Sequence, residues 1–403
     1  MEWIDRLDTW RASDATGPLQ ITLFPTNRCN LRCRICWQRE LEVDKAELSE
    51  DRLLRLVDEC ADAGVREWLI VGGGEPMLRA ETVIRMAERI RRRGMNGSLQ
   101  SNGTLFRPSH YERLILAGWQ NIIVSLDGPD EQLNDAVRSP GSFQKATAAM
   151  RLLTEMKRAQ AASLPRLSLN VTLTSPLVDR LSDLVALAID LGCEGDVNLS
   201  ELVVLGDDTR GLALTDADRA HLTSRVDAVL AGRPHLPFAT NLGIFTRDGG
   251  KPTGMSAADF RDANGTLERA ACYEPWLSIA VLPDGRSGPC CAMWAPDADS
   301  LADKSFQQVW RGQYLEGVRA QIREGKAPVY CRNCPSILGG HIREQRRVYR
   351  ERVEWLESGH ARRAVFLAQK AWRSARTHGL RGMVRRGIEW LKIKFAEKAH
   401  PRD

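Results

Sequence analysis

Short apolar and β-branched runs alternate with longer amphipathic stretches over the first two hundred residues. The expected strands are Leu19–Phe24, Trp68–Val71, Ser98–Gln100, Ile122–Leu126, Leu167–Leu173 and Val197–Leu205. Apolar residues recur at helical spacing between them, in Asp51–Ala63, Glu81–Arg93, Ser109–Ala117, Phe143–Arg158 and Leu181–Leu191. This alternation predicts an α/β fold with a parallel sheet, open or curled into a partial barrel. Reactive groups in such sheets lie at the carboxyl ends of the strands.

The chain has the composition of a folded protein without a membrane-spanning segment. It has 403 residues, of which 27% are charged, and no apolar run approaches the roughly 18–20 residues that span a bilayer. The first residues, MEWIDRLDTWRASD, contain acids and lack an apolar core, so they do not form a secretory signal. We therefore expect a cytoplasmic protein.

Four segments follow from the pattern along the chain. We expect a barrel over 1–231, a connecting segment rich in Gly, Pro, Asp and Asn over 232–270, a compact module over 271–340 and a basic helical tail over 341–403. Within the compact module, Asp284-Gly285 predicts the turn of a β-hairpin.

The tail differs in charge from the rest of the chain. Residues 341–403 contain 17 Lys and Arg against 7 Asp and Glu, whereas the remainder contains 40 against 45. Residues 380–395 place apolar side chains at helical spacing among arginines and lysines. Such a helix could lie on an anionic membrane surface, on the inner face of the membrane, or dock against the protein itself. We expect no binding to nucleic acid, because no nucleic-acid module is recognisable.

Seven of the ten cysteines form two groups. Cys29, Cys33 and Cys36 follow the first expected strand, and the second group contains Cys272, Cys290, Cys331 and Cys334. Thiols grouped at short spacing in a reducing compartment usually bind metal. Three thiolates are too few for structural zinc, which takes four ligands, but they can hold a 4Fe–4S cluster with one iron left open.

The spacing Cys29-x3-Cys33-x2-Cys36 after the first strand resembles the radical S-adenosylmethionine (SAM) superfamily. This resemblance implies a partial (βα)6 barrel similar to a TIM barrel, with a 4Fe–4S cluster on these three cysteines that binds SAM. It further implies an enzyme in which one electron cleaves SAM to methionine and a 5′-deoxyadenosyl radical. That radical abstracts hydrogen from a substrate carbon.

Further positions match the family residue by residue. The run Gly72-Gly73-Gly74-Glu75-Pro76 is similar to the family's Gly-Gly-Glu-Pro motif, in which glycines let the backbone approach the ligand and Glu75 accepts a hydrogen bond from the SAM ammonium. Ser101-Asn102-Gly103 resembles its Thr-Asn-Gly. By the same resemblance, the residues that contact SAM are Gly73, Gly74, Glu75, Pro76, Asn102, Ser125 and Arg138. Asn170, on the fifth expected strand, is a further polar candidate for this contact.

The second group of cysteines resembles the C-terminal extension called SPASM, or its shorter form, twitch. Cys272-x12-Gly285-x4-Cys290, followed by Cys331-x2-Cys334, matches the single-cluster form, because no cysteine follows Cys334. Four thiolates would saturate one auxiliary 4Fe–4S cluster and suit it to electron transfer. An all-thiolate zinc ribbon is the alternative.

Three cysteines lie outside the two groups. Cys60 and Cys193 are expected to be buried core thiols. Cys291 adjoins a predicted ligand and could donate a hydrogen atom to a substrate radical.

The resemblance leaves the substrate open. We expect oxidation or epimerisation of a small polar or glycosyl substrate, with a flavodoxin or ferredoxin as reductant. The alternative is a maturase of a ribosomally made peptide. The short segment before the first strand disfavours this alternative. A second alternative is a non-catalytic iron–sulfur electron carrier, which would not need the Gly-Gly-Glu-Pro motif.

Overall fold

The computed structural model describes residues 2–12, 16–40, 46–204, 206–233, 235–242, 257–291, 295, 297–334 and 336–357. The chain divides into two compact units, Met1–Arg343 and Glu344–Asp403. In the second unit the described residues, 344–357, form the C-terminal part of helix α14 (Ser336–Glu357). The basic stretch 380–395 lies outside the described residues, so its helix and its membrane contact stay predictions, as does the division into four segments.

The first unit is built on a nine-stranded sheet with the order β7-β6-β5-β4-β3-β2-β1-β8-β9. Its strands are β1 (Gln20–Leu23), β2 (Glu67–Ile70), β3 (Asn96–Ser101), β4 (Asn121–Ser125), β5 (Arg166–Leu173), β6 (Asp196–Glu201), β7 (Ala239–Thr240), β8 (Ser278–Val281) and β9 (Ser287–Gly288). Neighbouring strands from β7 to β8 run parallel, and β9 is antiparallel to β8. The six predicted strands are confirmed as β1–β6, in a partial barrel.

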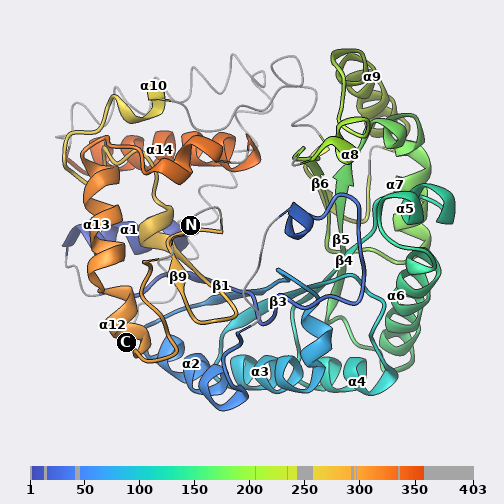
Figure 1. Cartoon of the computed structure of the whole chain (residues 1–403), viewed down its shortest axis with the longest axis horizontal. Helices are drawn as coiled ribbons and strands as arrows, with labels where there is room; N and C mark the ends of the chain where they lie inside the picture. The colour runs from blue at the N-terminus through green and yellow to red at the C-terminus, as the bar shows by residue number, and fades with distance from the viewer. Residues whose placement is uncertain are drawn as a thin grey trace. The chain divides into compact units, whose positions relative to one another are not determined.

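Helices connect the strands and cover the outer face of the sheet (Figure 1). The α-helices of this unit that precede α14 are α1 (Glu2–Ala12), α2 (Glu50–Asp62), α3 (Ala80–Arg92), α4 (Pro108–Leu116), α5 (Glu131–Val137), α6 (Ser142–Ala159), α7 (Leu181–Asp190), α8 (Asp207–Arg210), α9 (Asp216–Gly232), α10 (Ala257–Phe260), α11 (Glu274–Leu277), α12 (Phe306–Trp310) and α13 (Gln313–Arg323). Short 3-10 helices lie between them, at η1 (Trp37–Glu40), η2 (Pro76–Arg79), η3 (Ser175–Arg180) and η6 (Val329–Asn333).

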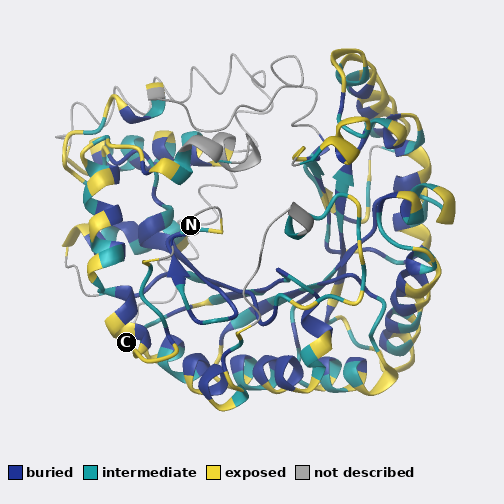
Figure 2. Cartoon of the chain, in the orientation of Figure 1, coloured by how far each residue is buried: buried dark blue, intermediate teal, exposed yellow. Residues whose placement is uncertain are grey.

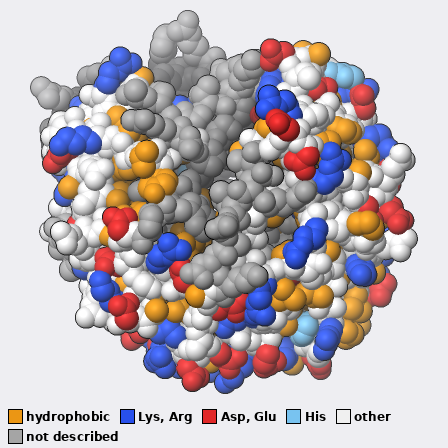
Figure 3. Space-filling model, in the orientation of Figure 1, with side chains coloured by type: hydrophobic (Ala, Val, Ile, Leu, Met, Phe, Trp, Pro, Cys, Tyr) orange, Lys and Arg blue, Asp and Glu red, His pale blue; other side chains and the backbone are white. Residues whose placement is uncertain are grey.

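The core lies between the sheet and these helices. Figure 2 shows the strands mostly buried and the outer helices buried on one side only. The apolar residues that recur at helical spacing in the sequence are therefore the buried sides of α2, α3, α4, α6 and α7. Acidic and basic side chains are interspersed over the face drawn in Figure 3. Within the described residues, no helix is both long and apolar enough to cross a membrane.

The predicted hairpin at Asp284-Gly285 is confirmed, but its first strand also extends the barrel sheet. Gly285 has a φ of +89°, and β8 and β9 pair on either side of it. β8 also pairs in parallel with β1 along its whole length, from Gln20 opposite Ser278 to Leu23 opposite Val281. β8, which lies in the segment with the second cysteine group, therefore pairs directly with β1, the strand that leads into the first group.

The N-terminal helix α1 packs against the same segment. Trp10 donates its indole N–H to the carbonyl of Trp276 at 3.0 Å, and its ring meets that of Trp310 edge-on at 6.0 Å. The buried Arg319 guanidinium lies 4.1 Å from the Trp310 ring centroid and donates to two backbone carbonyls. Burial lowers the pKa of Arg319 to about 10. These contacts join the start of the chain to α11, α12 and α13.

Candidate functional site

The first three cysteines lie on the loop that follows the carboxyl end of β1. All three are half-buried. The amide of Leu31 donates to Sγ of Cys29 at 3.4 Å, and the amide of Cys36 donates to the carbonyl of Cys33 at 3.2 Å. Burial raises the pKa of Cys29 and raises that of Cys33 to about 11. These thiols would therefore lose their protons on binding metal.

The glycine run after β2 packs directly against this loop. The amide of Gly74 donates to the carbonyl of Thr26 at 2.9 Å, and the amide of Glu75 donates to that of Arg28 at 2.8 Å. A Cβ at Gly74 would lie 1.9 Å from the Arg28 carbonyl oxygen, and a Cβ at Gly73 would lie 2.3 Å from Oδ1 of Asn27. Glycine is therefore required at these positions for the close approach to the cysteine loop. The approach to the ligand that the family resemblance implies stays a prediction.

Glu75 connects the ends of β2 and β3. Its side chain is buried and accepts three hydrogen bonds, from the amide of Met77 at 2.9 Å, the hydroxyl of Ser101 at 2.7 Å and the amide of Asn102 at 2.8 Å. Burial raises the pKa of Glu75, while these hydrogen bonds act to lower it. A carboxylate has about four acceptor positions, so one is left for a further donor. Contact with the SAM ammonium stays a prediction.

Glu75→Gln is expected to weaken SAM binding about 10- to 100-fold, which corresponds to a loss of about 1.5–3 kcal/mol. Gln places an NH2 group where one carboxylate oxygen now accepts hydrogen bonds. Either a protein donor or the SAM ammonium would therefore lose its acceptor. Anaerobic calorimetric titration with SAM would measure this. Glu112→Gln, an exposed change on α4, is the matched control and should leave the affinity unchanged. Equal affinities for Glu75→Gln and the unmodified protein would contradict a role for Glu75 at the SAM site.

Three other predicted SAM-contacting residues lie at or near the carboxyl ends of β3, β4 and β5. Asn102 follows β3, Ser125 ends β4, and Asn170 pairs with Ser125 from β5. Parallel strands present their carboxyl ends at one edge of a sheet. The topology therefore brings these residues to the edge that carries the cysteine loop. Their contacts with SAM stay predictions.

Arg138 forms a buried ion pair at this edge. Its Nε lies 2.6 Å from Oδ2 of Asp127, whose other oxygen accepts the amide of Thr172 at 2.6 Å. The Asp127 side chain is fully buried and that of Arg138 is 12% exposed. Burial alone would lower the pKa of Arg138, but Asp127, together with the nearby Cys33, raises it.

The cysteine loop is hydrogen-bonded to the residues on both sides of Arg138. The amide of Arg34 donates to the carbonyl of Val137 at 2.8 Å, and the amide of Arg32 donates to Oγ of Ser139 at 2.9 Å. Arg138 is the C-cap of α5, a helix that the sequence pattern did not predict. Asp127 was also missed as a site residue, although an acid at the end of a buried strand is a signal for one.

The second group of cysteines gathers around the β8–β9 hairpin. Cys272 and Cys290 lie on either side of the hairpin, whereas Cys331 and Cys334 lie in and just after η6. Burial raises the pKa of Cys272, and the charges of Cys290 and Cys331 raise it further. The pKa of Cys331 is likewise raised to about 11 by burial and by Cys334.

Both groups offer the donor chemistry of iron–sulfur clusters. Four sulfurs around one zinc ion must each lie about 2.3 Å from the same point. Among the described residues, no three or more His, Cys, Asp or Glu side chains converge in a way that would hold a single metal ion. In a 4Fe–4S cluster each thiolate binds a different iron, so the sulfurs need not converge. The donors of both groups are all cysteine thiols, which suit an iron–sulfur cluster and also a zinc ion.

The remaining cysteines differ in exposure. Cys60 and Cys193 are buried, as predicted, whereas Cys291 is exposed. Burial raises the pKa of Cys193 to about 12. The role of Cys291 as a hydrogen donor stays a prediction.

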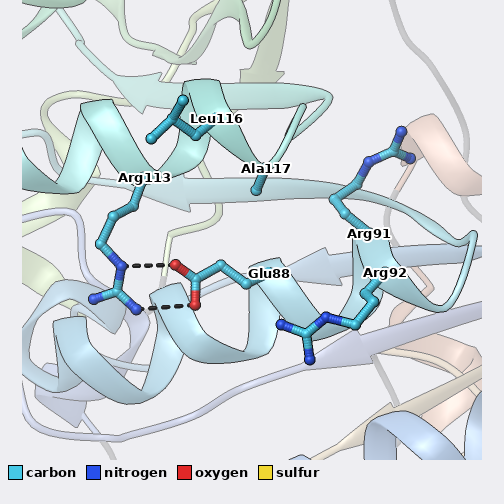
Figure 4. Close-up of a pocket in the computed structure, with 6 residues that line it drawn as sticks. All are labelled: Glu88, Arg91, Arg92, Arg113, Leu116 and Ala117. Carbon is cyan, nitrogen blue, oxygen red and sulfur yellow. Dashed lines mark hydrogen bonds and ion pairs between the residues drawn. The ribbon is translucent and has the colours of Figure 1, made fainter.

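A cavity of about 420 Å³ lies between α3 and α4, away from this site (Figure 4). Glu88 and Arg113 join the two helices through hydrogen bonds of 2.7 and 3.0 Å, and Arg92 and Leu116 also line the cavity. Arg92 and Leu116 lie at the C-terminal ends of their helices, which lead into the amino ends of β3 and β4. The cavity is therefore at the opposite ends of the strands from the cysteine loop.

Two family models match the chain. The model of the radical SAM superfamily matches residues 23–164, and the SPASM model, described as an iron–sulfur cluster-binding domain, matches residues 272–335. The first match contains the cysteine loop and the glycine run, and the second contains all four cysteines of the second group. Residues 23–164 therefore form a radical SAM domain, and residues 272–335 form a SPASM iron–sulfur cluster-binding domain. These two domains imply a 4Fe–4S cluster, SAM and auxiliary iron–sulfur binding.

Several characterised proteins resemble parts or most of the chain. An AdoMet-dependent heme synthase of Nitratidesulfovibrio vulgaris is 34% identical over 30% of this chain and 33% of its own length. A mycofactocin maturase of Mycobacterium tuberculosis is 28% identical over 79% of this chain and 76% of its own length. A PqqA peptide cyclase of Granulibacter bethesdensis is 26% identical over 73% of this chain and 74% of its own length. The chain spans less than half the length of three of the curated relatives it matches, for which the match covers 33%, 48% and 43% of the relative.

A solved structure supports the fold. SuiB of Streptococcus suis bound to S-adenosylmethionine superimposes with a TM-score of 0.60 at 17% identity, covering 78% of this chain and 71% of SuiB. SuiB has also been solved with its precursor peptide SuiA. At this identity the likeness establishes the fold and leaves the substrate open.

Proposed function

We propose that the chain is a radical SAM maturase that modifies a peptide. The observation that supports this is the extent of two matches, to a peptide cyclase and to a mycofactocin maturase, which cover 73% and 79% of the chain. The matches to three heme synthases cover 30%, 44% and 41%. The comparisons thus favour the peptide alternative over the small polar or glycosyl substrate that was the main prediction from sequence.

The residues at the barrel edge would serve the first half of the reaction. When bound, the cluster and SAM supply a 5′-deoxyadenosyl radical from one added electron, with methionine as the second product. Cys29, Cys33 and Cys36 would hold three irons and leave the fourth for SAM. The turn at Glu75 and the Arg138–Asp127 pair would orient SAM against that iron.

The second cysteine group would serve the later half. In a net oxidation the peptide carbon gives one hydrogen atom to the 5′-deoxyadenosyl radical and then loses one electron and one proton. Cys272, Cys290, Cys331 and Cys334 would hold the group that takes up this electron. A flavodoxin- or ferredoxin-type protein would supply the electron that cleaves SAM.

Deuterium transfer tests the peptide assignment. The reconstituted, reduced protein is incubated with SAM and, separately, with deuterated peptides encoded beside its gene and with deuterated sugar nucleotides. We expect deuterium in 5′-deoxyadenosine from one peptide, and a peptide product that has lost two hydrogen atoms if the reaction is a net oxidation. Deuterium from a sugar nucleotide, with every peptide inert, would overturn the peptide assignment in favour of the glycosyl one.

A further inference from the structure

Three polar side chains form a closed ring between the cysteine loop and the end of β3. Nδ2 of Asn102 donates to Oδ1 of Asn30 at 2.9 Å, and Nδ2 of Asn30 donates to the hydroxyl of Thr104 at 2.9 Å. The Thr104 hydroxyl closes the ring by donating to Oδ1 of Asn102 at 2.7 Å. Asn30 lies between the first two cluster cysteines, so the ring connects their loop, which follows β1, to the end of β3, two strands away in the sheet.

The ring occupies most of the hydrogen-bonding capacity of Asn102. Its Oδ1 accepts from both the amide and the hydroxyl of Thr104, at 2.9 and 2.7 Å, and its Nδ2 donates to Asn30. A side-chain amide has one acceptor oxygen and two donor hydrogens. This leaves one Nδ2 hydrogen for any other partner. The side chain of Asn102 is therefore used to hold the loop.

The end of β3 to which the ring attaches is itself fixed. The amide of Asn102 donates to Glu75 at 2.8 Å, and the hydroxyl of Ser101 donates to the same carboxylate at 2.7 Å. The amide of Glu75 in turn donates to the carbonyl of Arg28. Cys29 thus has an anchored residue on each side, Arg28 through Glu75 and Asn30 through the ring.

We propose that Asn30, Asn102 and Thr104 are positioning residues for the first cluster, which hold the Cys29–Cys33 loop in the geometry that leaves an open iron for SAM. This inference rests on the radical SAM activity under the proposed function and does not depend on the identity of the substrate. It assigns the side chain of Asn102 to the cysteine loop, whereas the family resemblance had assigned it to SAM.

Thr104 provides the test, because its hydroxyl both donates and accepts in the ring. Thr104→Val keeps the shape of the side chain and removes both hydrogen bonds, whereas Thr104→Ser keeps the hydroxyl. We expect the loss of both hydrogen bonds to weaken the affinity for SAM about 5- to 10-fold. The readout is the electron paramagnetic resonance spectrum of the reduced protein, titrated with SAM. The half-converting SAM concentration is the one at which half of the spectral change is complete. The change reports the first cluster, because SAM binds only the cluster with an open iron.

Each outcome decides the proposal. We expect Thr104→Val to raise the half-converting SAM concentration about 5- to 10-fold, and Thr104→Ser to restore it. An unchanged concentration in Thr104→Val, even with a lowered melting temperature, would overturn the positioning role. Equal losses in Thr104→Val and Thr104→Ser would also overturn it, because the hydroxyl would not be the cause. If SAM leaves the spectrum of the unmodified protein unchanged, the proposed function itself fails.

Discussion

Replacing Cys29, Cys33 and Cys36 together by Ala is expected to abolish SAM cleavage and to lower the iron content from about eight to about four atoms per chain. The reason is that these three thiols are the predicted ligands of the cluster that binds SAM, whereas the second group would keep its own cluster. Iron analysis after anaerobic reconstitution and chromatographic measurement of 5′-deoxyadenosine would test both expectations.

A double variant, Cys60→Ala with Cys193→Ala, is the control for the removal of thiols outside the predicted sites. Both residues are buried and lie outside the two cysteine groups, so iron content and SAM cleavage should be retained, although some stability is lost by cavity formation. A triple variant that still binds about eight irons would show that the ligands of the first cluster lie elsewhere.

Arg138→Met is expected to destabilise the first unit by about 3–5 kcal/mol, because it leaves the buried Asp127 carboxylate without its cation. The side chain of Asp127 is fully buried and its Oδ2 lies 2.6 Å from Nε of Arg138. The substitution should also reduce SAM binding, since Arg138 flanks the cysteine loop. Chemical denaturation would measure the first effect and SAM titration the second.

The control is an ion pair of the same type on the surface. Arg151 lies 3.2 Å from Asp190, and both side chains are more than half exposed, so Arg151→Met should change the free energy of unfolding by about 0–1 kcal/mol. If Arg138→Met were as mild as Arg151→Met, the Asp127–Arg138 pair would not hold the barrel edge as described.

Local periodicity predicted the six strands and five of the helices of the barrel. The strands β1–β6 and helices such as α2 and α3 each bury one side, which leaves a repeating apolar pattern in the sequence. The glycines after α2 and α3, Gly64 and Gly94, have φ values of +80° and +75°, as expected of residues that follow a helix. The helix α9 was missed, because its pattern is weak, although Thr215 and Asp218 form a capping box at its start.

Contacts between distant segments could not be predicted. The parallel pairing of β8 with β1 joins residues more than 250 positions apart, and such a register leaves no local signal. The same holds for Trp10, whose partners Trp276 and Trp310 lie far along the chain. The sequence could therefore indicate which residues carry the chemistry, but it could not show what holds them.

The motifs at the candidate site show the same limit. The Gly-Gly-Glu-Pro resemblance selected Glu75, but the three donors that surround its carboxylate come from η2 and from the end of β3. Asn30 carried no signal by itself, because an Asn in a loop is common. The family resemblance did select its partner in the ring, Asn102, but as a residue that contacts SAM and not as one that holds the cysteine loop.

Reductive cleavage of SAM is the reaction on which the assignment of this chain as an enzyme depends. The anaerobically reconstituted full-length chain is reduced and incubated with SAM, and 5′-deoxyadenosine and methionine are quantified against the triple cysteine variant. We expect both products in equal amounts from the unmodified chain and neither from the variant. A reduced, iron-loaded chain that forms no 5′-deoxyadenosine would contradict the radical SAM chemistry and leave an iron–sulfur protein that only carries electrons.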